Sequence, residues 1–314
     1  MSFHQPTRPQ QGLTLVEVMI VITISTILMS GVLQILVSNN QHYRTQEAAS
    51  RLQENGRFAA HLITQEIRMA DFWGCAGSTT NVTDHLNLPL VGTSNPATPL
   101  EGGITGTNDN GLNGSDTITI QGAFGGSIGV STHNVMAAIF SVSSINHPLN
   151  NGDVVLVSDC QNADLFQVSD TNAGTHANVA AATGSGIPGN ASQPRTSYAN
   201  GAAMIFEVRK ITYSIKTSTS GQPALYRRHN GTNIEMVEGV ENMQIIYGED
   251  TDNDQTANRY VHAGTTGLVM DNVVSVRITL TLRSIEDNVV DTPANGDRRL
   301  RRNYSTTITI RNRV

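Results

Sequence analysis

The sequence is poor in cysteine and in charge, and each shortage excludes a class of protein. Its 314 residues include two cysteines, too few for a zinc ribbon or a disulfide-dense scaffold. Charged residues make up 15% of the chain, whereas a soluble domain has about 25%. The net charge of −6 argues against a general nucleic-acid binder, whose binding face is basic. The hydrophobic fraction of 38% is adequate for a packed core and too low for a polytopic membrane protein.

Proline is also missing between residues 9 and 89, so nothing interrupts a helix over this stretch. The segment Leu13–Leu36 is mostly apolar and carries one charge, Glu17. As a helix it would be about 36 Å long, enough to cross a bilayer core of about 30 Å. The leader, residues 1–12, has Arg8 as its only charge, which favours a cytoplasmic N-terminus. The start of the chain therefore predicts a membrane-spanning helix.

Residues 37–73 continue the helical pattern but are amphipathic. They carry four charges of each sign. One face can pack on a domain while the other faces water, and Gly74 and Gly77 bracket the predicted stop. Together the two halves predict one helix of about 55–60 residues, near 85 Å long. The predicted packing face consists of Leu52, Gly56, Ala59, Leu62, Ile63, Ile67 and Ala70.

From residue 74 to residue 314 the hydrophobic period changes to two, which predicts a β-rich head and an α+β fold class. Strands with one polar face indicate an antiparallel sheet, half solvated, with the helix covering the other face. Two stretches rich in small and polar residues, Gly92–Ser115 and Ala173–Thr196, are predicted as loops. The predicted strands are Asp116–Gln121, Val135–Val142, Asp153–Ser158, Asp164–Val168, Met204–Ile215, Ala224–Arg228, Glu241–Tyr247, Val273–Arg283 and Ser305–Arg311.

The residues around the start of the apolar segment carry a specific signal. A general secretory signal places its cleavage site after the apolar run, and no such site follows Leu36. Instead Gly12 precedes the run, and Glu17 would be costly in lipid without a partner. Gly12-Leu13-Thr14-Leu15-Val16-Glu17 resembles the class III signal of type IV prepilins. The alternative is a plain transmembrane anchor with a tolerated Glu17.

This resemblance implies a processing step and an assembly contact. Prepilin peptidase would cut after Gly12 and methylate the new amino terminus on Leu13, which replaces the usual Phe. Glu17 then falls at the fifth mature position, where pilins carry a near-universal Glu. The cationic amine of one subunit can pair with the Glu17 carboxylate of a neighbour in an apolar filament core, where an unpaired charge would be strongly destabilising.

Six further stretches, in order along the chain, resemble PilW-type minor pilins. The resemblance implies a tip complex with other minor pilins that primes pilus assembly, and the nearest relative would be pseudopilin J of type II secretion. The stretches are Phe72–Cys75, Gly114–Ile120, Gly152–Cys160, Val240–Gly248, Val276–Ile278 and Arg311–Arg313.

The resemblance yields a full set of expectations for organisation. A leader (1–12), a transmembrane and filament-core half-helix (13–36), an amphipathic half-helix (37–73) and a β-rich head (74–314) are expected. Before assembly the protein would cross the inner membrane once with its head in the periplasm, and afterwards it would lie in the pilus. Expected partners are other minor pilins, the major pilin, prepilin peptidase and the inner-membrane assembly machinery.

Enzymatic and nucleic-acid functions have little support in the sequence. It contains no G-x-S-x-G, H-E-x-x-H or Walker loop, and its nine histidines stand at no metal-ligand spacing. A structural, non-enzymatic subunit is therefore expected. The one basic cluster could contact DNA or guard a strand edge, but only Tyr304 supplies an aromatic side chain nearby, so nucleic-acid binding is not favoured. A DNA- or surface-binding tip module remains the alternative. The cluster is Arg298, Arg299, Arg301 and Arg302, with Arg311 and Arg313.

The two cysteines are predicted to form a disulfide. Cys75 and Cys160 both lie in the head, which would be exported to an oxidising compartment. Two cysteines in such a domain usually form a disulfide. The bond would tie the helix end to the strand predicted at Asp153–Ser158. The alternative is two buried free thiols.

The alternating acids Asp250, Asp252 and Asp254 resemble the start of a calcium loop. Three carboxylates at this spacing can turn inward around one hard cation. Gln255 stands where an EF-hand loop needs Gly, and Val261 where it needs a bidentate Glu. An acidic, solvated hairpin turn is therefore the favoured alternative to a calcium site.

Overall fold

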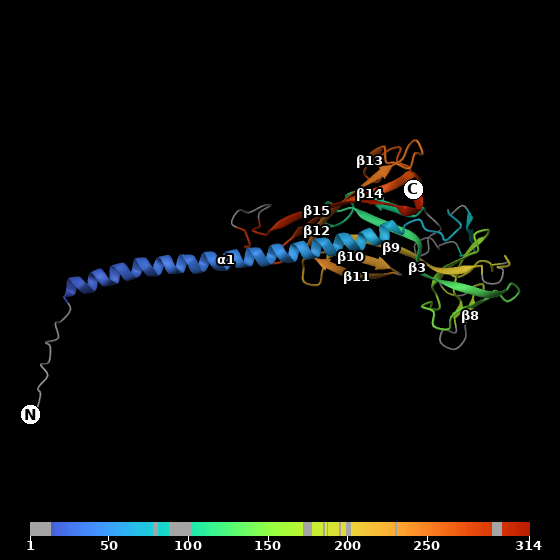
Figure 1. Ribbon diagram of the computed structural model, residues 1–314, viewed down its shortest axis with the longest axis horizontal. Helices are drawn as coiled ribbons and strands as arrows, with labels where there is room; N and C mark the ends of the chain where they lie inside the picture. Colours follow the sequence, from blue (N-terminus) through green and yellow to red (C-terminus); the bar gives the residue numbers. More distant parts are fainter. Residues whose placement is uncertain are drawn as a thin grey trace, which may run out of the picture. The chain divides into compact units, whose positions relative to one another are not determined.

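The computed structural model describes residues 14–77, 81–87, 102–171, 178–184, 186, 188–194, 196–198, 202–229, 231–290 and 297–314. Gly12 and Leu13 lie outside these residues. The chain divides into two compact units, Met1–Arg51 with Glu286–Leu300, and Leu52–Ile285 with Arg301–Val314. The second unit contains both β-sheets and the C-terminal part of helix α1 (Figure 1).

Helix α1 spans Leu15–Arg68, 54 residues without interruption. Thr14 caps its start, because the Thr14 hydroxyl accepts a hydrogen bond from the N–H of Glu17 at 3.3 Å. Thr14 and Glu17 also have the spacing of a capping box, in which an acid three residues after the cap supports the first turn. Within the described residues, α1 is the one helix long and apolar enough to cross a membrane. The prediction of a single long helix is confirmed.

The helix ends at Arg68 rather than at residue 73. The N–H groups of Met69 and Ala70 bond the carbonyls three residues back, each at 3.1 Å, which tightens the last turn. Asp71 then takes a φ of 60°, a left-handed conformation that terminates a helix and that Asp tolerates better than most residues. The stop comes earlier than the predicted one at Gly74, because Asp71 supplies the left-handed residue.

The amphipathic face of α1 is buried in the second unit much as its spacing predicts. Ile63 and Ile67 are among the most completely buried side chains, whereas Leu62 is only half-buried. Gly56 is required by a close approach, since a Cβ there would lie 2.4 Å from the ring of Tyr304. The buried positions of this face in the second unit are Leu52, Gly56, Ala59, Ile63, Ile67 and Ala70.

Within the residues that the structure describes, the head contains two sheets, whereas the sequence predicts one. The first has eleven strands, with a main order of β1-β6-β5-β9-β3-β4-β8-β7 and with β2, β10 and β11 joined at its sides. Among the strand pairs that the structure describes, all in this sheet are antiparallel except β1 with β6, which is parallel. Its strands are β1 (Thr83–Asp84), β2 (Ile104–Thr107), β3 (Thr117–Asn134), β4 (Ile139–Val142), β5 (Val154–Ser158), β6 (Ala163–Gln167), β7 (Asp170–Thr171), β8 (Asn178–Ala180), β9 (Met204–Thr217), β10 (Pro223–His229) and β11 (Thr232–Glu238).

The second sheet is antiparallel, in the order β13-β12-β14-β15. Its central strands are hydrophobic at alternate positions, and β14 pairs with β12 on one side and β15 on the other. The strands are β12 (Val240–Glu249), β13 (Arg259–Val261), β14 (Val273–Arg283) and β15 (Arg301–Thr309). The sequence prediction of β14 is correct at both ends.

Strand β3 shows why one prediction was wrong. It runs on to Asn134, although the pattern predicted a strand ending at Gln121 and another beginning at Val135. A bulge between Phe124 and Ile128 absorbs the intervening glycines while pairing with β9 continues on both sides. Val135 instead begins a turn, in which Ala138 has a φ of 50°.

Candidate functional site

The N-terminal signal is described only from Thr14 onward. Glu17 lies in the first turn of α1 and is exposed. The 18 most apolar consecutive residues of α1 have a mean hydropathy of 2.3, and none of them is buried. Side chains such as Leu15 and Ile27 are 76% and 66% exposed. An apolar surface of this size requires lipid or other apolar helices to cover it.

The C-terminal part of α1 is fastened to the first sheet through a half-buried carboxylate. Glu66 accepts two hydrogen bonds from Arg227 on β10, at 3.0 and 2.8 Å. The hydroxyl of Tyr213 on β9 donates to the same carboxylate at 2.6 Å. Burial, together with the neighbouring charge of Glu66, raises the pKa of Tyr213, so this hydroxyl stays a donor. These contacts hold Glu66 as an internal ion pair rather than as a free surface acid.

The residues after α1 form a second joint with the C-terminus. Asp71 Oδ1 accepts hydrogen bonds from the indole N–H of Trp73 at 2.8 Å and from the backbone N–H of Gly103 at 3.1 Å. Asp71 Oδ2 accepts from Arg313 at 2.5 Å. The side chain of Asn312 donates to the carbonyl of Ala70 at 2.9 Å, which satisfies one of the last carbonyls of the helix. Two of the pilin-like stretches, Phe72–Cys75 and Arg311–Arg313, therefore meet here.

A third joint links the two sheets. Asp116 precedes β3, and its carboxylate accepts the N–H of Ile245 on β12 at 2.6 Å and that of Asp109 at 2.8 Å. Its own N–H donates to the carbonyl of Met243 at 2.8 Å. The stretches Gly114–Ile120 and Val240–Gly248 thus contact one another through a buried aspartate. Both stretches resemble PilW-type minor pilins, but the sequence does not predict this contact.

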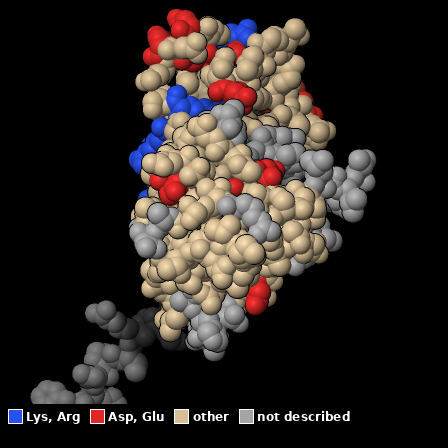
Figure 2. Space-filling model, turned by 90° about the vertical axis from the view of Figure 1, so that its right-hand side faces the viewer, with Lys and Arg blue, Asp and Glu red and all other residues tan. Residues whose placement is uncertain are grey.

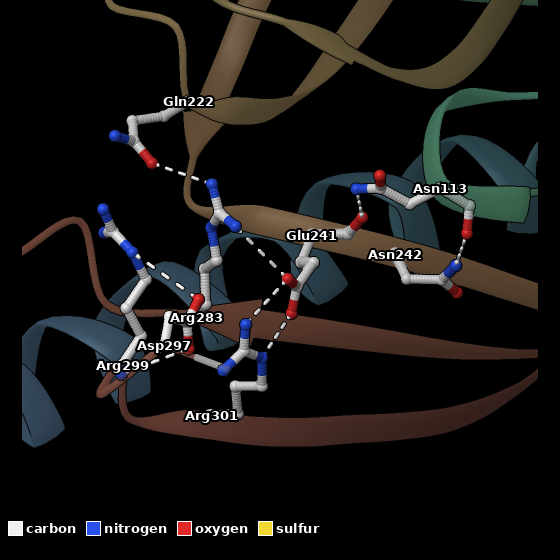
Figure 3. Close-up of polar contacts among 8 residues, drawn as sticks. All are labelled: Asn113, Gln222, Glu241, Asn242, Arg283, Asp297, Arg299 and Arg301. Carbon is white, nitrogen blue, oxygen red and sulfur yellow. Dashed lines mark hydrogen bonds and ion pairs between the residues drawn. The ribbon is translucent and has the colours of Figure 1, made fainter. Parts of the chain in front are cut away.

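Glu241 on β12 accepts hydrogen bonds from two arginines of the second sheet, Arg283 on β14 and Arg301 on β15 (Figure 3). Its carboxylate accepts from Arg301 at 2.6 and 3.0 Å and from Arg283 at 3.3 Å. The side chain of Asn113 donates to the Glu241 carbonyl at 3.1 Å. Arg301 is therefore held in a bidentate pair whose geometry suits guanidinium and carboxylate.

These pairs change the interpretation of the basic cluster. Arg301 is bound to Glu241, Arg313 to Asp71 and Arg299 to Asp297. Arg298, Arg302 and Arg311 are exposed. On the face drawn in Figure 2, Lys and Arg side chains lie beside Asp and Glu rather than in a broad basic patch. The geometry favours a structural role for at least half of the cluster over contact with phosphates.

Cys75 and Cys160 form a disulfide, with their Cα atoms 4.7 Å apart. Cys160 follows β5 and has a φ of 69°, so a left-handed residue turns the chain toward Cys75. Beside the bond, Trp73 is 1% exposed in a hydrophobic cluster with Leu156 and Leu165. The bond joins the segment after α1 to the central part of the first sheet.

The acids proposed to bind calcium do gather in one turn. Ligand oxygens of Asp250, Asp252 and Asp254 lie within 4.8 Å of one another. Asp250 is buried, and its Oδ1 accepts the N–H groups of Asp252, Asn253 and Asp254 at 3.2, 2.7 and 3.3 Å. Its Oδ2 accepts that of Gln255 at 2.7 Å. Burial raises the pKa of Asp250, but these hydrogen bonds outweigh it and hold the pKa below its ordinary value. The turn is ordered by its own backbone, which supports the hairpin interpretation, and the calcium hypothesis stays a prediction.

Sequence patterns missed four carboxylates that organise the head: Glu66, Asp71, Asp116 and Glu241. Glu66 and Asp71 read as solvent-facing charges at a helix end, and Glu241 as the polar face of a strand. Asp116 and Glu241 lie inside pilin-like stretches, and Asp116 also stands directly before an alternating run, so these two positions carried a signal.

Two family models match parts of the chain. Residues 212–312 match the family described as Type IV Pilus-assembly protein W, or PilW, and residues 7–33 match the prokaryotic N-terminal methylation motif. No curated protein and no solved structure matches the chain. The two matches confirm the resemblance to PilW-like type IV pilins and support a part in type IV pilus assembly. The PilW match covers β10 to β15, and the methylation motif includes Gly12, Leu13 and Glu17.

Proposed function

We propose that this PilW-like chain is a structural minor pilin that joins other minor pilins in a complex priming type IV pilus assembly. One observation carries the proposal: the methylation motif leads directly into a half-helix whose apolar side chains are exposed. Such a surface suits lipid before assembly and neighbouring apolar helices afterwards. The head, in contrast, holds several of its charged side chains, such as Glu241 with Arg301 and Asp71 with Arg313, in ion pairs within itself.

The proposed assembly contact joins two subunits through Leu13 and Glu17. Cleavage after Gly12 would free the Leu13 amine, and methylation would leave it cationic. A neighbour's Glu17 could then pair with this amine among apolar helices. Either charge alone would be costly there, so the pair would favour the register in which both are satisfied.

The proposed placement follows the same logic. The N-terminus would face the cytoplasm and the head the periplasm before assembly, and the head would lie on the pilus afterwards. Partners would be other minor pilins, the major pilin, prepilin peptidase and the inner-membrane assembly machinery. A pseudopilin J-like role in type II secretion uses the same architecture, and co-purified subunits would separate the two systems.

The test compares Glu17→Ala with Glu47→Ala, which removes an exposed acid from the same helix outside the apolar half. Both variants should insert in the membrane, and Glu17→Ala should insert at least as well as the parent because it removes a charge from lipid. Only Glu17→Ala should lose pull-down of other minor pilins. Intact mass should also show loss of residues 1–12 and gain of one methyl group. Equal pull-down by both variants, or an unprocessed chain in assembled pili, would contradict the proposal.

A further inference from the structure

Three side chains in the head form a hydrogen-bonded series that the pilus role does not use. His85 Nδ1 lies 2.7 Å from the hydroxyl oxygen of Ser192, and His85 Nε2 lies 2.6 Å from Asp164 Oδ1. His85 and Asp164 are buried, whereas Ser192 is exposed. A hydroxyl, a base in contact with it and a third group that orients the base make up the arrangement that activates a nucleophile. No sequence motif indicates this series, because Asp164 and Ser192 lie 79 and 107 positions after His85.

The buried carboxylate decides which imidazole nitrogen carries the proton. Burial raises the pKa of Asp164, but hydrogen bonds from His85 and Tyr198 outweigh burial and hold it below its ordinary value. The hydroxyl of Tyr198 donates to Asp164 Oδ2 at 2.5 Å. An ionised carboxylate only accepts hydrogen bonds, so in this geometry His85 Nε2–H donates to Asp164, and Nδ1 is the ring nitrogen that faces the Ser192 hydroxyl as an acceptor. The imidazole is then oriented as a base toward the exposed hydroxyl.

Backbone contacts fix this geometry from both sides. The N–H of His85 donates to the carbonyl of Leu165 at 2.9 Å, and the His85 carbonyl accepts the N–H of Ala191 at 2.8 Å. The side chain of Asn190 bonds both the N–H and the carbonyl of Gln167, at 2.7 and 2.8 Å. The segment carrying Ser192 is therefore fastened to β6, which also carries Asp164. A site held this way needs little rearrangement to react.

We propose that Ser192 is an acylation site whose hydroxyl accepts the acyl group of an activated ester. The Ser192 oxygen attacks the ester carbonyl carbon while its proton passes to His85 Nδ1. The bond from that carbon to the leaving oxygen breaks, and the leaving alcohol takes the proton from His85. The acyl group remains on Ser192 as an ester, and His85 returns to its neutral form. Asp164 is a positioning residue, because it acts through His85 without touching the ester.

The experiment treats the full chain, kept in detergent, with p-nitrophenyl acetate and follows acetylation of individual peptides by mass. Ser197, an exposed serine in the same segment, is the internal control. Ser192 should be acetylated faster than Ser197 in the parent protein. His85→Gln should slow Ser192 by roughly 10²-fold or more, because general-base assistance is worth at least that much. Ser197 should keep its rate in that variant.

Two results would overturn the proposal. The first is a parent protein in which Ser192 reacts no faster than Ser197, and this comparison needs no variant to fold. The second is a His85→Gln variant with an unchanged thermal midpoint and an unchanged rate at Ser192. Ser192→Ala should lose the acetylated peptide while leaving His85 and Asp164 in place, which confirms the modified residue. Neither result bears on the pull-down test of Glu17, so the two proposals stand or fall separately.

Discussion

Arg313 donates from Nε to the carboxylate of Asp71 at 2.5 Å, although 242 positions separate the two residues in the sequence. The same guanidinium donates to the carbonyls of Met270 and Val273 through Nη1. Its side chain is only 5% exposed. The end of the chain is therefore built into the end of α1 and the start of β14.

Replacing Arg313 with Ala should destabilise the head by about 3 kcal/mol, since removing one partner of a buried pair leaves an uncompensated charge on the other. Urea unfolding of the full chain in detergent measures this free energy. Arg311→Ala is the matched control, because Arg311 is exposed and two residues away, and it should change the free energy little. Equal effects of the two substitutions would mean that the Asp71 pair contributes nothing specific.

Loss of the disulfide should lower the free energy of unfolding by roughly 4–5 kcal/mol in the chain-entropy account, because the bond closes a loop with a sequence separation of 85. The double variant Cys75→Ser with Cys160→Ser should therefore unfold at lower urea than the parent. Labelling by a thiol reagent under denaturing conditions should require reductant in the parent. Labelling without reductant would show that the thiols are free, and the double variant would then have no disulfide to lose and no reason to be less stable.

The stability of the second sheet should depend on pH through Glu249. A hydrogen bond from the N–H of Val269 and, to a smaller extent, the neighbouring Arg259 hold the pKa of Glu249 below its ordinary value, although burial of Glu249 acts in the opposite direction. Because the pKa of Glu249 is lower in the folded state, its carboxylate stabilises the folded protein at pH values above the unfolded pKa of about 4.5. This stabilisation is lost as the pH falls through the folded pKa. The difference in unfolding free energy between the parent and Glu249→Gln should thus be largest near pH 7 and shrink toward pH 3. A difference that does not change with pH would contradict this assignment.

Calcium should leave the head unchanged if the turn at Asp250 is complete without an ion. The Asp250 carboxylate already accepts hydrogen bonds from four backbone N–H groups. We therefore expect no rise in the thermal midpoint in millimolar calcium, with magnesium at the same ionic strength as the control. A rise that disappears when Asp252 and Asp254 are replaced by Asn would instead establish the calcium hypothesis.

The sequence predicted those features that depend on local periodicity. The helix was evident because an apolar run without proline joins an amphipathic one, and β14 because Val276, Ile278, Leu280 and Leu282 alternate with polar residues. The packing face of α1 also followed from spacing alone. Each of these patterns is repeated several times within one element, so a single exception does not hide it.

What the sequence did not predict depends on contacts between distant residues. The glycines of β3 favour a loop by composition, and only pairing with β9 shows that they belong to a strand. Strand β11 has mostly polar, exposed residues, so its period is weak, and it exists through its pairing with β10. The roles of Asp71 and Glu241 were hidden because a charged residue near an element end is ordinarily solvated, and its buried partner lies far along the chain.

The disulfide also has a consequence for a protein under tension. If the chain is pulled between α1 and its C-terminus, force passes from Cys75 to Cys160 through the bond rather than through the residues between them. At roughly 3.4 Å per residue, the residues bridged would otherwise yield about 290 Å of extension. Strands β1 to β5 and their loops lie in this bypassed stretch. While the disulfide is intact, force along the chain cannot extend these strands, so any lengthening must come from residues outside the stretch between Cys75 and Cys160.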